Sequence, residues 1–214
     1  MSETGRAGKV RVERRLVTAR HGADLLDRKQ RILADELGRL QLQVGRTRQE
    51  WEDRAREAAV WLRRAAALDG RERIEAAASI EQASAQVSWG GAMGVSYPED
   101  THCELPVAPH PGGTSALSYA ATTHRAALGA AVAHAAAQRA MLLVSAELTA
   151  TRTRHRAVEN RWVPRLEDEL MTIRRRLDEQ ELEESLRLRW AAEHGSTSGR
   201  GGRDSGSRRG PVSS

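Results

Sequence analysis

Few residues of this chain have the types and spacing that chemistry requires. His102, Cys103, Glu104 and His110 lie within nine residues and offer ligand types that a metal ion uses. One sulfur with two histidines in a proline-rich stretch has none of the usual spacings of a zinc site. No helix start or fixed base near Cys103 would activate its thiol as a nucleophile. We therefore expect a solvated loop here, and no catalytic residue, metal site or bound cofactor in the chain.

Two further patterns could in principle bind phosphate. The Gly-Gly pairs at residues 90–91 and 112–113 lack the lysine and the following helix of a phosphate-binding loop, which favours turns. Three arginines at residues 174–176 open the segment 174–189, where five basic and five acidic side chains are typical of a solvated helix face. Of the net charge of +5, three charges lie in the last twenty residues, so the body of the chain lacks the basic stripe that nucleic-acid binding requires.

The composition favours long helices over a compact globular core. The chain has 214 residues, of which 29% are charged and only 3% aromatic, and it contains no phenylalanine. A bias toward alanine, leucine, arginine and glutamate is typical of long helices and coiled coils. The single cysteine excludes an internal disulfide framework and fits a reducing compartment.

A first amphipathic helix is predicted over residues 10–68. Between residues 16 and 68, apolar or alanine side chains take 13 of the 16 positions that recur in alternating steps of three and four. A sustained period of 3.5 residues predicts a coiled coil, and a helix of this length would measure roughly 80 Å. The Asp69-Gly70 pair indicates a local end, and the alanine-rich residues 71–86 again favour helix.

The middle of the chain interrupts this pattern. Residues 88–115 contain five glycines and four prolines, which no regular helix tolerates. Within them, Met93–Tyr97 and Glu104–Val107 are predicted to pair as a small hairpin.

A second helix is predicted from residue 118 to residue 190. Its apolar stripe makes two successive steps of four at residues 162, 166 and 170, a stutter that relaxes a coiled coil locally. Pro164 lies beside the stutter and removes a backbone hydrogen bond, so we expect a bend or contact point at residues 160–166. The tryptophans on the two stripes, which we expect in the core, are Trp51, Trp61 and Trp162.

These patterns predict an all-α fold: a long antiparallel two-helix coiled coil of the N- and C-terminal helices, with a small irregular or β-hairpin head between them. The expected parts are the N-terminal helix (1–87), the head (88–117), the C-terminal helix (118–194) and a disordered tail (195–214).

In this arrangement residues 16–68 pair with residues 125–185, and Leu37 lies opposite residues 150–165. No signal peptide is expected, and the most apolar stretch, residues 126–137, is too short to span a bilayer.

Three stretches carry a recognisable pattern. Residues 14–29 read R-R-L-V-T-A-R-H-G-A-D-L-L-D-R-K, residues 163–167 read V-P-R-L-E, and the M-G-V of residues 93–95 is followed by Pro98. They resemble the D subunit of the rotary V/A-type ATPases (ATP synthases). In that family the first stretch reads A-R-x-G-x-x-L-L-x-x-K after basic residues, the second reads I-P-R-L-E, and the third reads M-G-V-x-x-P in a central hairpin. The resemblance covers nearly the whole chain except the last twenty residues.

The resemblance implies a central stalk, or rotor axle, that transmits torque between the catalytic A/B hexamer and the membrane ion-translocating rotor. The implied partners are the catalytic A and B subunits, the F subunit of the stalk and a funnel-like subunit that links to the membrane rotor. The chain itself would be non-catalytic, without cofactor or nucleic acid, cytoplasmic and peripheral to the cell membrane. The candidate axle or partner contacts are Arg20, Leu26, Lys29, Met93, Gly94, Val95, Pro98, Val163, Pro164, Arg165 and Leu166.

Two other classes of protein stay open. A structural coiled-coil scaffold without a rotary role explains the helices but gives no reason for the M-G-V-x-x-P stretch or for Pro164. A nucleic-acid-binding helical hairpin would use the arginine-rich tail but needs a basic stripe on the body. Neither the direction of ATP chemistry nor the choice of proton or sodium follows from this sequence, because ion choice belongs to membrane subunits.

Overall fold

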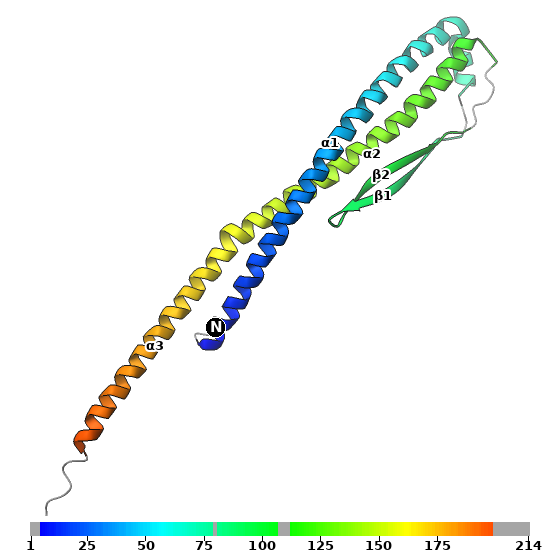
Figure 1. Ribbon diagram of the computed structural model, residues 1–214. Helices are drawn as coiled ribbons and strands as arrows, with labels where there is room; N and C mark the ends of the chain where they lie inside the picture. The colour runs from blue at the N-terminus through cyan, green and yellow to red at the C-terminus, as the bar shows by residue number, and fades with distance from the viewer. Residues whose placement is uncertain (1–4, 79–80, 107–111, 199–214) are drawn as a thin grey trace, which may run out of the picture. The chain divides into compact units, whose positions relative to one another are not determined.

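The computed structural model describes residues 5–78, 81–106 and 112–198, with side chains up to residue 193. Two long helical segments with a small antiparallel hairpin between them confirm the predicted fold class (Figure 1). The chain forms two compact units, a terminal unit (residues 1–21 and 158–214) and a central unit (residues 22–157). The elements in chain order are helix α1 (Arg6–Ala76), strands β1 (Ser84–Ala92) and β2 (Val95–Glu104), helix α2 (Ser115–Ala157), π-helix η1 (Val158–Trp162) and helix α3 (Val163–Ser198).

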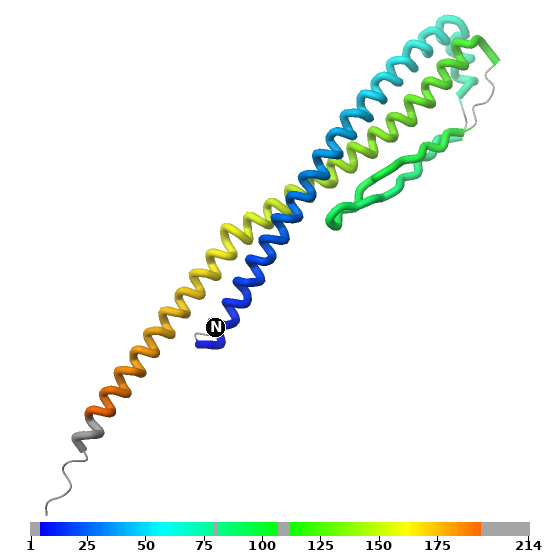
Figure 2. The backbone as a smooth tube through the Cα atoms, viewed as in Figure 1, coloured from blue at the N-terminus to red at the C-terminus, as the bar shows by residue number. Residues whose placement is uncertain are grey.

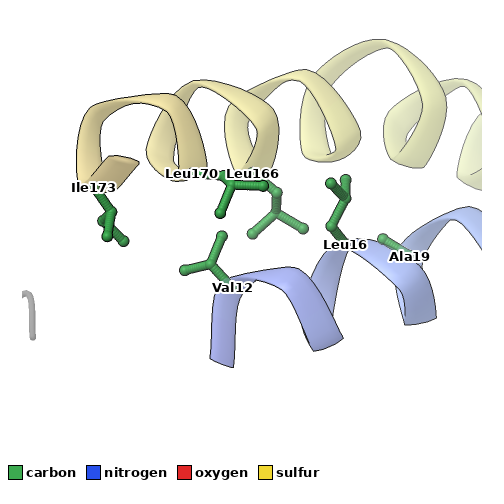
Figure 3. Packing of buried hydrophobic residues seen from close by; sticks show 6 residues of the cluster. All are labelled: Val12, Leu16, Ala19, Leu166, Leu170 and Ile173. Carbon is green, nitrogen blue, oxygen red and sulfur yellow. The ribbon is translucent and has the colours of Figure 1, made fainter. Parts of the chain in front are cut away.

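In the terminal unit, the first turns of α1 pack antiparallel against α3. Figure 3 shows apolar side chains of the two helices directed toward one another. Ion pairs flank this core, with Arg6 Nη2 3.2 Å from Glu181 Oε1 and Arg174 Nη2 3.0 Å from Glu13 Oε1. The core residues are Val12, Leu16, Ala19, Leu166, Leu170 and Ile173, all of which belong to the predicted stripes or extend them by one step.

In the central unit, α1 and α2 pack antiparallel over two apolar clusters. One cluster joins Leu33 and Leu40 of α1 to Val144 of α2, and the other joins Ala65 to Leu117. Steps of three and four place these side chains on one face of each helix, so pairing removes both faces from water. Alanines at residues 65, 116 and 120 let the helices approach closely next to the loop that connects them.

The helices pair antiparallel as predicted, but the predicted partner window of Leu37, residues 150–165, is wrong. Leu37 packs against the cluster that contains Ala140, Val144 and Leu148, so its partners precede residue 150. A heptad stripe explains the error, because sliding one helix by seven residues again places apolar side chains opposite one another.

A polar clasp closes the loop end of the central unit. Gly70 has φ 78°, a left-handed conformation that breaks the helical geometry of α1 directly after Asp69, where the sequence indicated an end. The Asp69 carboxylate accepts hydrogen bonds from the backbone N–H of Thr114 (2.9 Å) and from its hydroxyl. The Thr114 hydrogen bonds lower the pKa of Asp69 below its ordinary value. The clasp ties the end of α1 to the residue that precedes α2.

The hairpin differs from its predicted pairing. Strand β1 pairs antiparallel with β2 from Ser84↔Glu104 to Ala92↔Val95, so the segment Met93–Tyr97 holds the turn and the start of β2 rather than a first strand (Figure 2). Met93 (φ 50°) and Gly94 (φ 84°) form the two-residue turn, with the positive φ at both positions that a type I′ turn requires. The prediction also included Val107, which lies outside the described residues.

Two predicted helix ends also differ from the structure. Helix α1 ends at Ala76, and residues 84–86 lie in β1 although their alanine-rich context favoured helix. Pairing with β2 outweighs the weak local preference of this segment. Helix α3 continues to Ser198, past the start of the predicted tail, and residues 199–214 lie outside the described residues.

The predicted stutter takes the form of the π-helix η1. A π-helical turn holds one more residue than an α-helical turn, which accommodates two successive steps of four. Pro164 follows as the second residue of α3, where its missing N–H leaves no normal bond to Asn160. Trp162, expected in the core, is 47% exposed because the wider turn carries it off the apolar stripe. Trp51 and Trp61 lie at the margin of the helix pair and are only partly covered.

The helical segment Ser115–Glu193 is long and apolar enough to cross a membrane by length and composition, with an 18-residue window of mean hydropathy 1.4. The sequence predicted no span because the stretch 126–137 is too short. The longer window corrects that argument, since 18 residues of the helical segment are apolar enough by composition. One such helix is weak evidence for a span, since a core helix passes the same test, and 28% of the window is buried within the chain.

Candidate partner-contact surfaces

In the terminal unit, Arg20 borders a groove between α1 and α3. Its Nη2 atom lies 2.6 Å from Glu167 Oε1, and both side chains remain accessible to water. The groove has a volume of about 350 Å³ and is lined mainly by apolar surface from Leu16, Leu170 and Met171. An apolar floor beside a charged rim is the usual anatomy of a protein contact.

The four residues 163–166 divide between the core and the surface of the terminal unit. Leu166 is a buried core residue, and Val163 packs against the same core. Pro164 and Arg165 are exposed. Only these two can reach a partner directly, and the exposed Trp162 lies next to them in the chain.

Lys29 and Leu26 lie in the central unit, where Lys29 joins the two helices. Its Nζ atom lies 2.8 Å from Glu147 Oε1, and both side chains are half-buried. The hydrogen bond from Lys29 is the main cause that lowers the pKa of Glu147, against the opposing effect of burial. Thr151, which is fully buried, donates a longer hydrogen bond of 3.4 Å to the same carboxylate. Lys29 therefore acts inside the helix pair, and Leu26 is half-buried beside it.

The hairpin residues of the resemblance have two different roles. Met93 and Gly94 form the turn, and Met93 is exposed in a backbone conformation that non-glycine residues rarely adopt. Val95 packs against the apolar cluster of the central unit, and Pro98 is buried. The turn is therefore the part of this motif that a partner can contact.

A partly buried network that the sequence did not reveal fixes the hairpin to α1. The Tyr97 hydroxyl donates a hydrogen bond of 2.6 Å to Glu36 Oε1, and Arg39 donates to the same carboxylate from Nη2 (2.6 Å) and Nε (3.0 Å to Oε2). The Arg39 hydrogen bond lowers the pKa of Glu36, whereas burial is the largest cause that raises the pKa of Tyr97. The alternation of β2 could have shown Tyr97 as inward-facing, but no spacing pointed to Glu36.

Comparison with known sequences agrees with these features. The family model for the D subunit of ATP synthase matches residues 9–193. The chain belongs to the ATP synthase D-subunit family. It is also similar to the D subunit of a V-type ATP synthase from Anaeromyxobacter dehalogenans (strain 2CP-C), with 30% identity over 194 residues that span 87% of this chain and 93% of that protein.

The match to the D-subunit family covers every candidate contact residue. Arg20, Lys29, the hairpin turn and residues 163–166 all lie between residues 9 and 193, while the whole predicted tail, residues 195–214, lies beyond the match. As a D subunit, the chain belongs to a V-type ATP synthase complex, and this membership implies partner subunits.

A second buried polar contact of this D subunit also escaped the sequence patterns. His134 lies in an alanine-rich stretch of α2, is buried, and its Nδ1 atom is 3.2 Å from Thr47 Oγ1 of α1. Trp51 stacks on the His134 ring with centroids 5.5 Å apart and an interplanar angle of 14°. A polar layer inside an apolar seam favours one register, which the apolar stripes alone leave open.

The described residues contain no group of three or more His, Cys, Asp and Glu side chains that could hold a metal ion. His110, one of the four potential ligands in the sequence, lies outside the residues that the structure describes. Cys103 is a half-buried free thiol in β2.

Proposed function

We propose that this chain is the central-stalk subunit of a V-type rotary ATP synthase, without catalytic residues of its own. It transmits torque between the catalytic A/B hexamer and the ion-translocating rotor in the membrane. The observation that carries the proposal is the antiparallel helix pair in both units, with an apolar seam and charged outer faces. Family membership supports the same role.

Torque transmission requires that the two helices do not slide past each other. Apolar seams resist separation but are weak against sliding, because each position resembles the next. The polar contacts Lys29–Glu147, Thr47–His134 and the Asp69 clasp are specific to one register. They give the pair resistance to shear that leucines and alanines alone would not provide.

A rotating axle must also avoid binding its surroundings tightly. Several arginines of α1 already pair with acidic side chains one turn away, so their charges are partly satisfied within the helix. Exposed pairs of this kind contribute little to binding when they exchange partners. The pairs are Arg31–Asp27, Arg48–Glu52, Arg54–Glu50 and Arg56–Asp53.

The proposed partners are the A and B subunits, the F subunit of the stalk and a funnel-like subunit at the membrane rotor. For the funnel-like subunit, α3 offers a suitable surface beyond Glu181, the residue that pairs with Arg6 near the start of α1. Leu182, Leu186 and Leu188 are exposed there. The complex would lie on the cytoplasmic side of the cell membrane, with this chain peripheral to the bilayer.

Reconstitution with the A, B and F subunits of the same organism tests the proposal. We expect stoichiometric co-assembly and ATP-driven ion transport that depends on the chain once the membrane sector is added. A pure chain that binds a filament protein or nucleic acid, and fails to co-assemble with A and B, would contradict the proposal and favour the alternative classes.

Pro164→Ala tests whether the π-helix contributes to coupling. We expect ATP hydrolysis to persist in the assembled complex while the ratio of ions transported to ATP hydrolysed falls. Arg176→Ala removes an exposed side chain of α3 that is not among the candidate contacts, leaves the π-helix intact and serves as the control. An unchanged ratio with a higher melting temperature would mean that Pro164 is merely tolerated.

A further inference from the structure

The outer edge of β1 has no strand partner among the described residues. The sheet contains two strands, and β2 lies on the side of β1 that faces helix α2 and contacts that helix (Figure 1). Side chains from Ser84 to Trp89 are exposed, and this stretch has no proline and no charge. Proteins normally protect such edges with lysine, proline or a covering element, because a free edge pairs readily with another strand.

The hairpin region has a charge opposite to that of the whole chain. No lysine or arginine occurs between residues 74 and 124, although the chain carries a net charge of +5. Five acidic side chains lie in the same stretch, and three of them are on β2. They are Glu75, Glu81, Glu99, Asp100 and Glu104.

The acidic side chains of β2 are accessible from the edge of β1. Glu99 is the extra residue of a β-bulge between the pairs Ser88↔Asp100 and Trp89↔Pro98, and its side chain lies against Gly90, where a Cβ atom would collide with it. Ser88 is small and stands opposite Asp100. A strand added to β1 would lie about 10 Å from β2. A lysine or arginine side chain on the added strand is long enough to cross most of that distance toward Asp100, because the small Ser88 between them leaves room.

Exposed apolar side chains accompany the free edge. Trp89 is 62% exposed and Val87 is also exposed, whereas Tyr97 and Pro98 on β2 are buried. Aromatic side chains surrounded by polar groups are enriched at protein contacts.

We propose that the edge of β1 binds an extended, basic segment of a neighbouring stalk or catalytic subunit, which adds a third strand to the hairpin. This inference rests on the proposed function, because it assumes that the chain works within the ATPase complex. Backbone hydrogen bonds to β1 give affinity, Trp89 supplies the apolar contact, and Glu99 and Asp100 select lysine or arginine in the partner.

The hairpin is held in a way that suits this role. Tyr97 holds one end of β2 on α1. At the other end, Arg125 of α2 donates hydrogen bonds to the carbonyl oxygens of Pro106 (2.6 Å) and Leu105 (3.3 Å), directly after β2. Contacts at both ends of β2 keep the strand on the helices, so the partner segment meets an ordered edge.

Hydrogen–deuterium exchange of residues 84–92 tests the inference, comparing the isolated chain with the complex reassembled from A, B, F and this chain. We expect alternate amides of β1 to exchange about tenfold or more slowly in the complex, because they gain backbone hydrogen bonds. A photo-crosslinking residue at position 88 should label one lysine- or arginine-containing segment of another subunit.

Charge variants at one position separate charge from size. Ser88→Lys should abolish the protection and the cross-link, because the lysine pairs with Asp100 and repels a basic segment, whereas Ser88→Glu should retain both. Trp89→Ala should weaken the protection, and Leu42→Ala, which removes an exposed leucine from α1, should not. Equal loss in both Ser88 variants would overturn the charge argument.

The occupant itself is also open to refutation. Labelling of residues 199–214 of the same chain, or of a second copy, would overturn the assignment to a partner subunit. Unchanged exchange in an active, coupled complex would overturn the inference while the proposed function stands. Failure of the chain to co-assemble with A and B would overturn both.

Discussion

Tyr97→Phe removes a single hydrogen bond from the contact between the hairpin and α1. The wild-type hydroxyl donates to Glu36 Oε1 at 2.6 Å, and the ring is only 5% exposed within the apolar cluster of the central unit. Phenylalanine retains the ring and its packing, so any change in stability reports on the hydrogen bond. Tyr119→Phe is the matched control, because Tyr119 is exposed and the chain has only these two tyrosines.

The expected loss of stability follows from the surroundings of Glu36. A hydrogen bond to a charged group contributes about 1.5–3 kcal/mol. We expect a value near the lower limit, about 1.5 kcal/mol, because the remaining partner Arg39 still satisfies the carboxylate. That free energy corresponds to roughly a tenfold change in the equilibrium between docked and undocked hairpin.

The effect should depend on pH in a defined direction. Arg39 lowers the pKa of Glu36 below 4.5, opposed in part by burial and assisted by Tyr97. The stabilisation that ionised Glu36 provides is therefore complete above about pH 4.5 and is lost as the pH falls through its folded-state pKa. Burial raises the pKa of Tyr97 above 10.0, so its contribution is complete below pH 10 and is lost as the pH rises through the folded-state pKa. The difference between wild type and variant should therefore be largest between about pH 5 and pH 9.

Two measurements on the isolated chain check this reasoning. Hydrogen exchange of the β2 amides reports local undocking, and urea unfolding reports the free energy of the whole central unit. A Tyr97→Phe chain that matches Tyr119→Phe within about 0.3 kcal/mol at pH 7 would show that the Tyr97 hydroxyl does not hold the hairpin.

Three further predictions concern the helix pair. Leu33→Ala should lower the free energy of unfolding by about 2–5 kcal/mol, since the side chain is fully buried, whereas Leu42→Ala on the exposed face should change it by less than about 0.5 kcal/mol in the same urea titration. Gly45→Ala should raise the free energy of unfolding by about 0.5–1 kcal/mol, because a Cβ atom there meets nothing within 4 Å and alanine favours helix; an unchanged or lower value would contradict this. Asp69→Ala should lower the melting temperature more than Thr114→Ser, because serine keeps both hydrogen-bond donors of the clasp. The difference in melting temperature between Asp69→Ala and wild type should shrink in acid, where wild-type Asp69 becomes protonated.

Local periodicity was sufficient to predict the helices and much of their core. Leu16, Leu33, Leu40 and Leu166 lie on the predicted stripes and are buried, because steps of three and four place them on one face of a helix. The stutter likewise predicted an irregularity near Pro164, and the structure has the π-helix directly before it.

The register and the hairpin required information that periodicity does not contain. Apolar stripes fit several registers, and the contacts that select one, such as Thr47–His134, join residues 87 positions apart. The turn was missed because Met93-Gly94 lacks the asparagine or aspartate that usually occupies the first left-handed position. Of the candidate contacts, Leu166 and Pro98 are buried within the chain, because a family motif also contains residues that serve the fold.

The contacts that hold β2 also bear on how β1 would bind a partner. An isolated two-stranded hairpin is marginally stable in water, so a partner strand would have to order it on binding and would lose affinity. Tyr97–Glu36 and Arg125–Pro106 supply that order in advance from α1 and α2. Tyr97→Phe should therefore weaken the protection of β1 in the assembled complex, although Tyr97 lies on the other strand and does not contact the added segment. Weakened protection in Tyr97→Phe together with normal protection in Tyr119→Phe would link the Tyr97–Glu36–Arg39 network to the proposed edge contact, and equal protection in both would separate them.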